Sequence, residues 1–364
     1  MKNKSTNLCS LYLITSIILS SSLFYCTHAN NLTKSNEANN ATLQMDEEDD
    51  GASVGSVWMS VAYFLLGLLF SFLNLLVGSV LQRCGLSQPT SLILRSCCLA
   101  NFIGLFPKTI WSPLVAALPS MYHPSHLWQV IPGLLLSFGL HWSFALRTLM
   151  SLNRAIAIGY RSVAQKLFSV KRTWQWLALT LMFGAVHGAI TLLPCCHLAF
   201  VPGLWRWRYT GHAFRTQCHA DSTTTGILIL ICILCHTLTL LKIREYKAAI
   251  IHKQILAKEG KQELRVFVGF SVTVLIWIAG TVGFLLPQFF PKIRGKWIGP
   301  FVETNRYILL TMDPIMSLLT ISKVRQQVSQ KLRSFYAAIF QKKGTQVRVY
   351  TIGGGGKVAP MPRN

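Results

Sequence analysis

The chain has 364 residues, of which 51% are hydrophobic and 13% are charged, and its formal net charge at pH 7 is +23. Soluble domains carry about 25% charged residues, so water alone is an unsuitable solvent for this chain. The basic residues lie between long apolar runs rather than along one face, which excludes nucleic acid as a partner and predicts a lipid bilayer as the surroundings.

The first 56 residues predict an exported and glycosylated amino terminus. Residues 1–29 carry two lysines, an apolar core and a small-residue ending, which is the layout of a cleavable signal peptide; a short signal anchor is the alternative. Acceptor sequons follow at Asn31 and Asn40, ahead of the acidic run MDEEDD. We therefore expect residues 30–56 to form a disordered, glycosylated extracellular tail.

Seven apolar runs follow, each close to the length of about 20 residues that a helix needs to cross a bilayer. Because lipid permits no unpaired backbone groups, these runs predict an all-α membrane protein, a seven-transmembrane helix bundle over residues 57–321. Glu303 and Asp313 interrupt the last run, which leaves six spans as an alternative. The predicted spans cover residues 57–81, 91–114, 128–153, 173–194, 223–242, 265–287 and 297–321.

Lysine and arginine gather in the loops after the third and fifth spans and in the carboxyl-terminal tail. Cytoplasmic loops collect these residues, so we expect a plasma-membrane protein with its amino terminus extracellular and its carboxyl terminus cytoplasmic. Residues 322–343 place apolar side chains at helical spacing among basic ones, which predicts an amphipathic cytoplasmic helix. Residues 344–364, with four consecutive glycines, predict a disordered basic tail.

The stretch SLNRAIAIGYR places Asn153 and Arg154 where the third span loses its apolar character. Arginine keeps its proton, so its side chain must reach water or find a partner. An arginine that only snorkels to the interface is the alternative interpretation.

Polar residues also interrupt three other spans. Asn74 lies in the first span, Asn101 in the second, and Asp313 precedes Pro314 in the seventh. Buried amides hydrogen-bond across helices in lipid, and a proline frees a backbone carbonyl that can join them. We expect Asn74, Asn101 and Asp313 to form one polar cluster inside the bundle.

At these residues the chain resembles the rhodopsin-like (class A) G-protein-coupled receptors. SLNRAIAI is similar to the family's D-R-Y segment, with Arg154 as the arginine, and DPIMS is similar to its N-P-x-x-Y segment. The asparagine before Arg154 is similar to that of some invertebrate orphan and chemosensory receptors. The resemblance covers roughly residues 55–335. It implies a chemosensory receptor that binds a small-molecule ligand between its helices and switches a cytoplasmic site for a heterotrimeric G protein.

The chain departs from the family pattern at three positions. Asn153 replaces the acidic residue before the arginine, Ser317 stands in place of the tyrosine, and no proline follows two residues after Trp277. Arg154 therefore lacks the usual neighbouring counter-ion, and the acids available to it are Glu259 and Glu263, at the start of the sixth helix. A pairing that breaks when that helix moves is the kind of bistable contact that switching requires. The predicted switch residues are Asn153, Arg154, Glu259, Glu263, Asp313 and Pro314.

Three cysteines, Cys195, Cys196 and Cys218, lie in a loop on the outer, oxidising side. The family ties this loop to the third span, but here that span has no cysteine. We expect a disulfide within the loop, from either Cys195 or Cys196 to Cys218. Trp205 and Trp207, which lie between Cys196 and Cys218, suit either the lipid interface or a lid over a ligand.

Polar side chains in the outer halves of the spans are candidates for ligand binding, with ordinary packing as the alternative. We expect no metal, no cofactor and no enzymatic activity, because the sequence shows no paired intramembrane carboxylates, zinc ligand set or serine nucleophile motif. A transporter or channel with Arg147 and Asp313 as a charge pair is the alternative function, although internal repeats are lacking. The candidate ligand residues are His141, Trp142, His187, Glu303, Asn305 and Arg306.

Overall fold

The computed structural model describes most of the predicted bundle. Of the predicted site residues, five lie outside the described part of the chain, namely Asn31, Asn40, Cys195, Glu259 and Glu263, and so does the side chain of Cys218. The described residues are 54–118, 127–193, 196–202, 205–210, 214–250, 267–269, 271–281 and 298–341.

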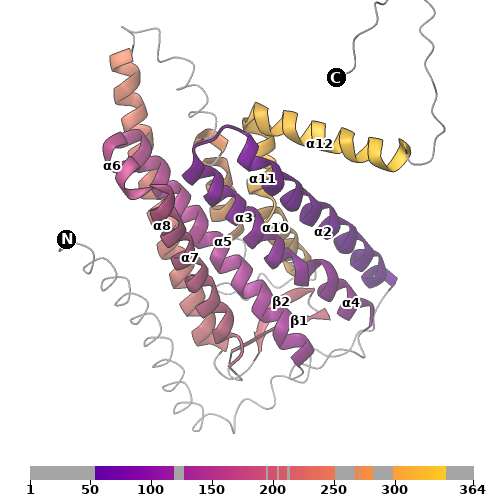
Figure 1. Cartoon of the computed structure of the whole chain (residues 1–364). Helices are drawn as coiled ribbons and strands as arrows, with labels where there is room; N and C mark the ends of the chain where they lie inside the picture. The colour runs from indigo at the N-terminus through magenta and orange to yellow at the C-terminus, as the bar shows by residue number, and fades with distance from the viewer. Residues whose placement is uncertain are drawn as a thin grey trace, which may run out of the picture.

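The long helices lie side by side in a bundle, with a small hairpin at one end and α12 at the other (Figure 1). The five longest bundle helices are α2 (Val54–Val80), α3 (Gln88–Phe106), α5 (Leu127–Gly159), α7 (Val170–Ile190) and α8 (Phe214–Ile250). The shorter elements are α4 (Ser112–Ala117), α6 (Arg161–Leu167), α10 (Ile298–Leu309), α11 (Met312–Thr320), α12 (Ser322–Gln341) and an apolar helix over Phe267–Thr281.

Each of the seven predicted spans coincides with helix among the described residues. Within the described part of the chain, four stretches are long and apolar enough to cross a membrane by length and composition. Helix α7 is not among these four. The four stretches are Val57–Arg83, Gln88–Ala117, Trp128–Gly159 and Asp221–Glu245.

The seventh span is not the single helix that we predicted over residues 297–321. It is broken by a turn at Leu310 and Thr311, which separates α10 from α11. Proline has no backbone N–H and clashes with the carbonyl four residues earlier, so Pro314 interrupts the helix at Leu310. The carbonyl of Leu310 accepts a side-chain hydrogen bond instead, from Asn74 Nδ2 at 3.1 Å.

Strands β1 (His197–Val201) and β2 (Arg206–Thr210) form an antiparallel hairpin that the sequence analysis did not predict. Phe200 pairs with Trp207 in this register, and both side chains are buried against the bundle. The Trp207 indole N–H donates to Ser112 Oγ at 2.9 Å. Trp207 is therefore part of a lid that packs on the helices and not an anchor at the lipid interface.

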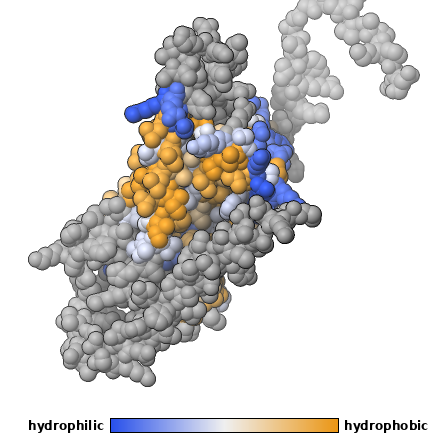
Figure 2. Space-filling model, turned by 90° about the vertical axis from the view of Figure 1, so that its left-hand side faces the viewer, coloured by the Kyte–Doolittle hydropathy of each residue, from blue (hydrophilic) through white to orange (hydrophobic). Residues whose placement is uncertain are grey.

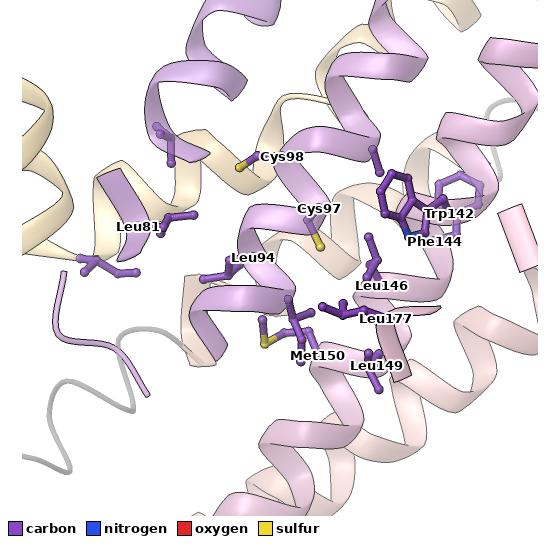
Figure 3. Close-up of a cluster of buried hydrophobic side chains, with 14 of the residues drawn as sticks. Leu81, Leu94, Cys97, Cys98, Trp142, Phe144, Leu146, Leu149, Met150 and Leu177 are labelled. Atoms are coloured by element: carbon purple, nitrogen blue, oxygen red, sulfur yellow. The ribbon is translucent and has the colours of Figure 1, made fainter. Parts of the chain in front are cut away.

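The apolar core lies between α2, α3, α5, α7 and α8 (Figure 3). Cys97 of α3 points toward Leu146 of α5 in this core, to which Leu94 and Met150 also belong. Farther toward the hairpin the same two helices approach more closely, where Gly139 faces Gly104. A Cβ atom at Gly139 would lie 2.6 Å from Gly104 Cα, so this crossing requires glycine.

The lateral surface of the bundle is apolar, as a protein surrounded by lipid requires. Large hydrophobic side chains are exposed along α2, for example Leu65 and Phe72, and along α8, for example Leu230 and Leu238. Figure 2 shows hydrophobic side chains across the middle of one face and hydrophilic side chains at its upper edge. The described surface thus has the apolar belt of a membrane protein.

Helix α12 follows α11 directly and turns away from the bundle axis (Figure 1). Val324 and Val328 are buried against the bundle, while Lys331 and Arg333 are exposed. The apolar side chain of Phe335 is also exposed, at 57% of its surface. This pattern is that of an amphipathic helix after the last span.

Candidate functional site

An ion pair between Arg147 of α5 and Asp313 of α11 lies at the centre of the bundle. The Arg147 Nη2 and Nε atoms donate to Asp313 Oδ2 at 2.8 and 3.1 Å. The two side chains have relative exposures of 0% and 1%, so neither charge reaches solvent. Removal of either partner would leave an uncompensated charge in a medium of low dielectric constant.

Amide and hydroxyl groups from two further positions complete this central cluster. Asn101 of α3 donates from Nδ2 to Asp313 Oδ2 at 2.9 Å, and its Oδ1 accepts from Ser143 Oγ at 2.6 Å. The structure therefore brings Asn101 and Asp313 together. Ser143 is fully buried on α5, one helical turn before Arg147.

Side-chain donors hold the backbone at the break in the last span. Arg147 Nη2 donates to the carbonyl of Leu309 at 2.8 Å. Asn74 of α2 donates to the next carbonyl, that of Leu310, and also to Phe70 within its own helix. Helices α2 and α5 thus contact the junction of α10 and α11 through hydrogen bonds that either helix could release.

Arg154 lies two turns along α5 from Arg147, farther from the hairpin. Arg154 Nη2 donates to Thr90 Oγ1 of α3 at 3.2 Å, and Asn153 Nδ2 lies 3.4 Å from the same oxygen. Both residues are buried, at 4% and 5% exposure. The pairing of Arg154 with Glu259 or Glu263 concerns residues outside the described part of the chain and stays a prediction.

A cavity of about 90 Å³ lies at the hairpin end of the bundle. The hairpin covers it through Leu198 and Tyr209, and Leu309 forms part of its wall. Its volume is small compared with drug-sized pockets of about 300–1,000 Å³, so it suits a ligand of few atoms. The other lining residues are Leu136, Ser137, Leu140, His141, Phe144, Asp221, Ser222, Thr225, Gly280, Thr281, Asn305 and Arg306.

The structure places the six predicted ligand residues in three kinds of position. His141, Asn305 and Arg306 line the cavity. Trp142 packs in the core beside Phe138 of its own helix, with ring centroids 5.4 Å apart. The remaining two, His187 and Glu303, are buried close by.

Glu303 belongs to a second buried charge cluster, beside the cavity wall. It pairs with Lys108, which is fully buried, and with Arg306 at 3.0 Å. Its other contact is the backbone N–H of Trp207 in the hairpin, at 3.1 Å. Glu303 thus links the lid to α10 and to the π-helical turn that contains Lys108.

Three charged residues of these clusters and of the cavity wall were absent from the predicted receptor site, namely Lys108, Arg147 and Asp221. Arg147 lies seven residues before Arg154, so helical periodicity places both on one face of the third span. That spacing could have identified it as a second inward-facing arginine. Lys108 and Asp221 lie near the ends of apolar runs, where a charged residue is common and carries little information.

The family model of the serpentine-type 7TM GPCR chemoreceptors called Srx matches residues 64–312. This chain belongs to the Srx chemoreceptor family. Among solved structures, squid rhodopsin has the same fold, with a TM-score of 0.65 at 16% sequence identity over 80% of this chain and 89% of the squid chain. Comparison with curated protein sequences gives no match.

The Srx assignment confirms the predicted fold and the predicted class of function. The chain is a multi-pass membrane protein with the seven-helix fold of rhodopsin, and it is a G-protein-coupled chemosensory receptor and not an enzyme. Neither comparison supports a transporter or channel. The Arg147–Asp313 pair is therefore interpreted below as part of a receptor.

Proposed function

We propose that this Srx receptor binds a small molecule in the cavity under the hairpin and transmits binding to the Arg154 end through the Arg147–Asp313 pair. A single observation carries the proposal. The side chain of Leu309 lines the cavity, and its carbonyl accepts a hydrogen bond from Arg147. A ligand that displaces α10 at Leu309 would therefore change the contacts of the buried guanidinium.

The ion pair suits such a role because its partners come from different helices. Asp313 lies on α11 and Arg147 on α5, while Leu309 lies at the end of α10. A shift of α10 that lengthens the Leu309 contact would leave Arg147 held by Asp313 and, at 3.5 Å, by Asn101. The free-energy difference between the two arrangements is what a ligand would have to supply through preferential binding to one of them.

The opposite end of the bundle would bind the heterotrimeric G protein. We propose that this end is cytoplasmic, that Arg154 alternates between Thr90 and the acids at 259 and 263, and that α12 lies on the inner leaflet. Exposed Lys331 and Arg333 on α12 support this orientation, because anionic lipid attracts each cation by about 1 kcal/mol.

The hairpin end would then face outward in the plasma membrane. This orientation places the signal peptide, the glycans at Asn31 and Asn40 and the disulfide from Cys195 or Cys196 to Cys218 on the extracellular side. Deglycosylation on intact cells and the accessibility of a carboxyl-terminal epitope only after permeabilisation would test it. An epitope labelled on intact cells would refute the orientation.

A cavity-filling variant tests the ligand site. Cells that express the receptor would be screened with volatile and water-soluble compounds, with G-protein activation as the readout. Gly280 lines the cavity and has open space around it, so Gly280→Leu should fill the site without a clash. Gly226→Leu, in exposed and equally open space on α8, is the matched control.

We expect Gly280→Leu to raise the half-maximal concentration of an active compound at least about tenfold, which corresponds to about 1.4 kcal/mol. Gly226→Leu should leave it unchanged, and Arg154→Ala should abolish G-protein activation with normal surface expression. An unchanged half-maximal concentration in Gly280→Leu would place the ligand elsewhere.

A further inference from the structure

Two histidines and an aspartate from three helices meet beside the cavity, and His141 and Asp221 line it. His141 of α5 and His187 of α7 both face Asp221 of α8: His141 Nε2 lies 3.6 Å and His187 Nδ1 3.4 Å from the same carboxylate oxygen. All three candidate ligand atoms lie within 4.8 Å of one another. The histidine side chains are buried, with 6% and 4% exposure.

Hydrogen bonding fixes the tautomer of His141. Its Nδ1 lies 2.8 Å from the carbonyl oxygen of Ser137, which can only accept, so Nδ1 carries the proton. The Nε2 lone pair of the neutral ring then points toward the Asp221 carboxylate. A histidine whose other nitrogen donates to a backbone carbonyl is the arrangement found in protein metal sites, where that bond orients the ring.

Three of the four histidine ring nitrogens in this cluster lack a hydrogen bond of good geometry among the described residues. These are His141 Nε2 and both ring nitrogens of His187. The two rings are stacked, with centroids 4.0 Å apart and an interplanar angle of 7°. One proton could join the carboxylate to only one of the rings, whereas one divalent ion could bind both rings and the carboxylate.

The distances also suit a metal ion. Zinc binds imidazole nitrogen and carboxylate oxygen at about 2.0–2.2 Å, and in a tetrahedral site two such ligand atoms are about 3.4 Å apart. The separations of 3.4 and 3.6 Å from the Asp221 oxygen match this value. The other oxygen of Asp221 accepts the hydroxyl of Tyr209, as carboxylates that bind metals usually do from a neighbouring donor.

We propose that His141, His187 and Asp221 bind a divalent transition-metal ion, Zn²⁺ in the first place. Imidazole with carboxylate is a ligand set that zinc accepts, and three protein ligands leave a fourth position for water or another donor. His141 and Asp221 line the cavity, so this fourth position is within reach of a small molecule there. The inference extends the proposed ligand site, but metal binding itself requires neither a ligand nor a G protein.

Calorimetric titration of ZnCl₂ into the purified full-length receptor in lipid nanodiscs tests the proposal. We expect one Zn²⁺ per receptor, and at a concentration of 100 times Kd a rise in Tm of about 5 °C that a chelator reverses. His141→Gln, His187→Gln and Asp221→Asn should each weaken binding at least about 100-fold, since loss of a direct ligand exceeds the effect of losing its hydrogen-bonded neighbour. His236→Gln is the matched control, because His236 lies on α8 away from this cluster and contacts Ser271.

Absence of zinc binding to the wild-type receptor would overturn the proposal, and so would equal binding by wild type and His141→Gln. If the variants fail to fold, X-ray absorption of the zinc-loaded wild type decides. Nitrogen and oxygen neighbours at about 2.0–2.2 Å with imidazole scattering support the site, whereas sulfur at about 2.3 Å would overturn it. Normal signalling by a receptor that binds no zinc would refute this inference alone and leave the proposed function intact.

Discussion

Replacement of the Arg147–Asp313 pair by apolar side chains should show how strongly the two charges depend on each other. Among the described residues, the Asp313 carboxylate keeps only the amide of Asn101 in Arg147→Met, and the guanidinium keeps only oxygens of Leu309 and Asn101 in Asp313→Leu. Breaking a buried pair from one side costs about 3–5 kcal/mol, while replacing both partners by apolar groups is often neutral. We therefore expect each single variant to be much less stable than the double variant.

The size of the effect follows from the burial of the pair, whose side chains have 0% and 1% exposure. Since 1 kcal/mol shifts Tm by about 2 °C in a bundle as long as residues 57–321, each single variant should lose about 6–10 °C. The double variant should lie within about 5 °C of the wild type. Thermal unfolding of the purified receptor can be followed with a thiol-reactive dye, because Cys97 and Cys98 are buried and become reactive on unfolding.

Arg95→Met is the control, since Arg95 is exposed and bonds only to the Gln82 side chain among the described residues. Its Tm should stay within about 2 °C of the wild type, because surface substitutions change stability by about 0.5 kcal/mol or less. If the losses of Tm in the two single variants simply add in the double variant, the pair carries no coupling, and the proposed relay would lose its physical basis.

Three further predictions concern the switch, the helix crossing and the loop. Charge reversal at Glu259 or Glu263 should raise basal G-protein activation by releasing Arg154; unchanged basal activity at normal surface expression would count against this pairing. Gly139→Ala should lower Tm by about 5 °C or more, because its Cβ would lie 2.9 Å from a backbone oxygen, while Gly226→Ala has open space; equal Tm values would contradict the close crossing. Cys218→Ser should remove a disulfide that closes a loop of about 22 residues and lower the free energy of unfolding by about 3 kcal/mol. A mass-spectrometric peptide map that shows a free Cys218 thiol in the wild type would disprove the disulfide.

Hydropathy and charge predicted the bundle because a backbone that crosses lipid must satisfy its own hydrogen bonds, which a helix does. Asn101 and Asp313 could be expected to meet because polar side chains in lipid form hydrogen bonds with one another across helices. The break at Leu310 was missed, although Pro314 signals it, because an apolar run of suitable length reads as one helix. The partner of Arg147 was noticed only as a feature of a transporter, since one sequence does not say which helix faces it.

The cavity could not be predicted for a different reason. Its lid is the hairpin, and the pairing of Phe200 with Trp207 depends on strand register that no local pattern in this loop reveals. His187 and Asp221 come from the ends of two neighbouring helices, and their meeting with His141 depends on the rotation of three helices about their axes. Sequence periodicity fixes such a rotation only to within a wide sector of the helix surface.

Helix α12 limits how the last span can move. It follows α11 with one intervening residue, Ile321, and exposes Phe335 and Tyr336 near its far end. With α12 on the membrane surface, a piston-like displacement of α11 along the bilayer normal would pull these rings out of the headgroup region, at about 1.5–3 kcal/mol for an apolar ring. Sideways tilting leaves them at the same depth, so this receptor should open by tilting of its last helix and not by sliding.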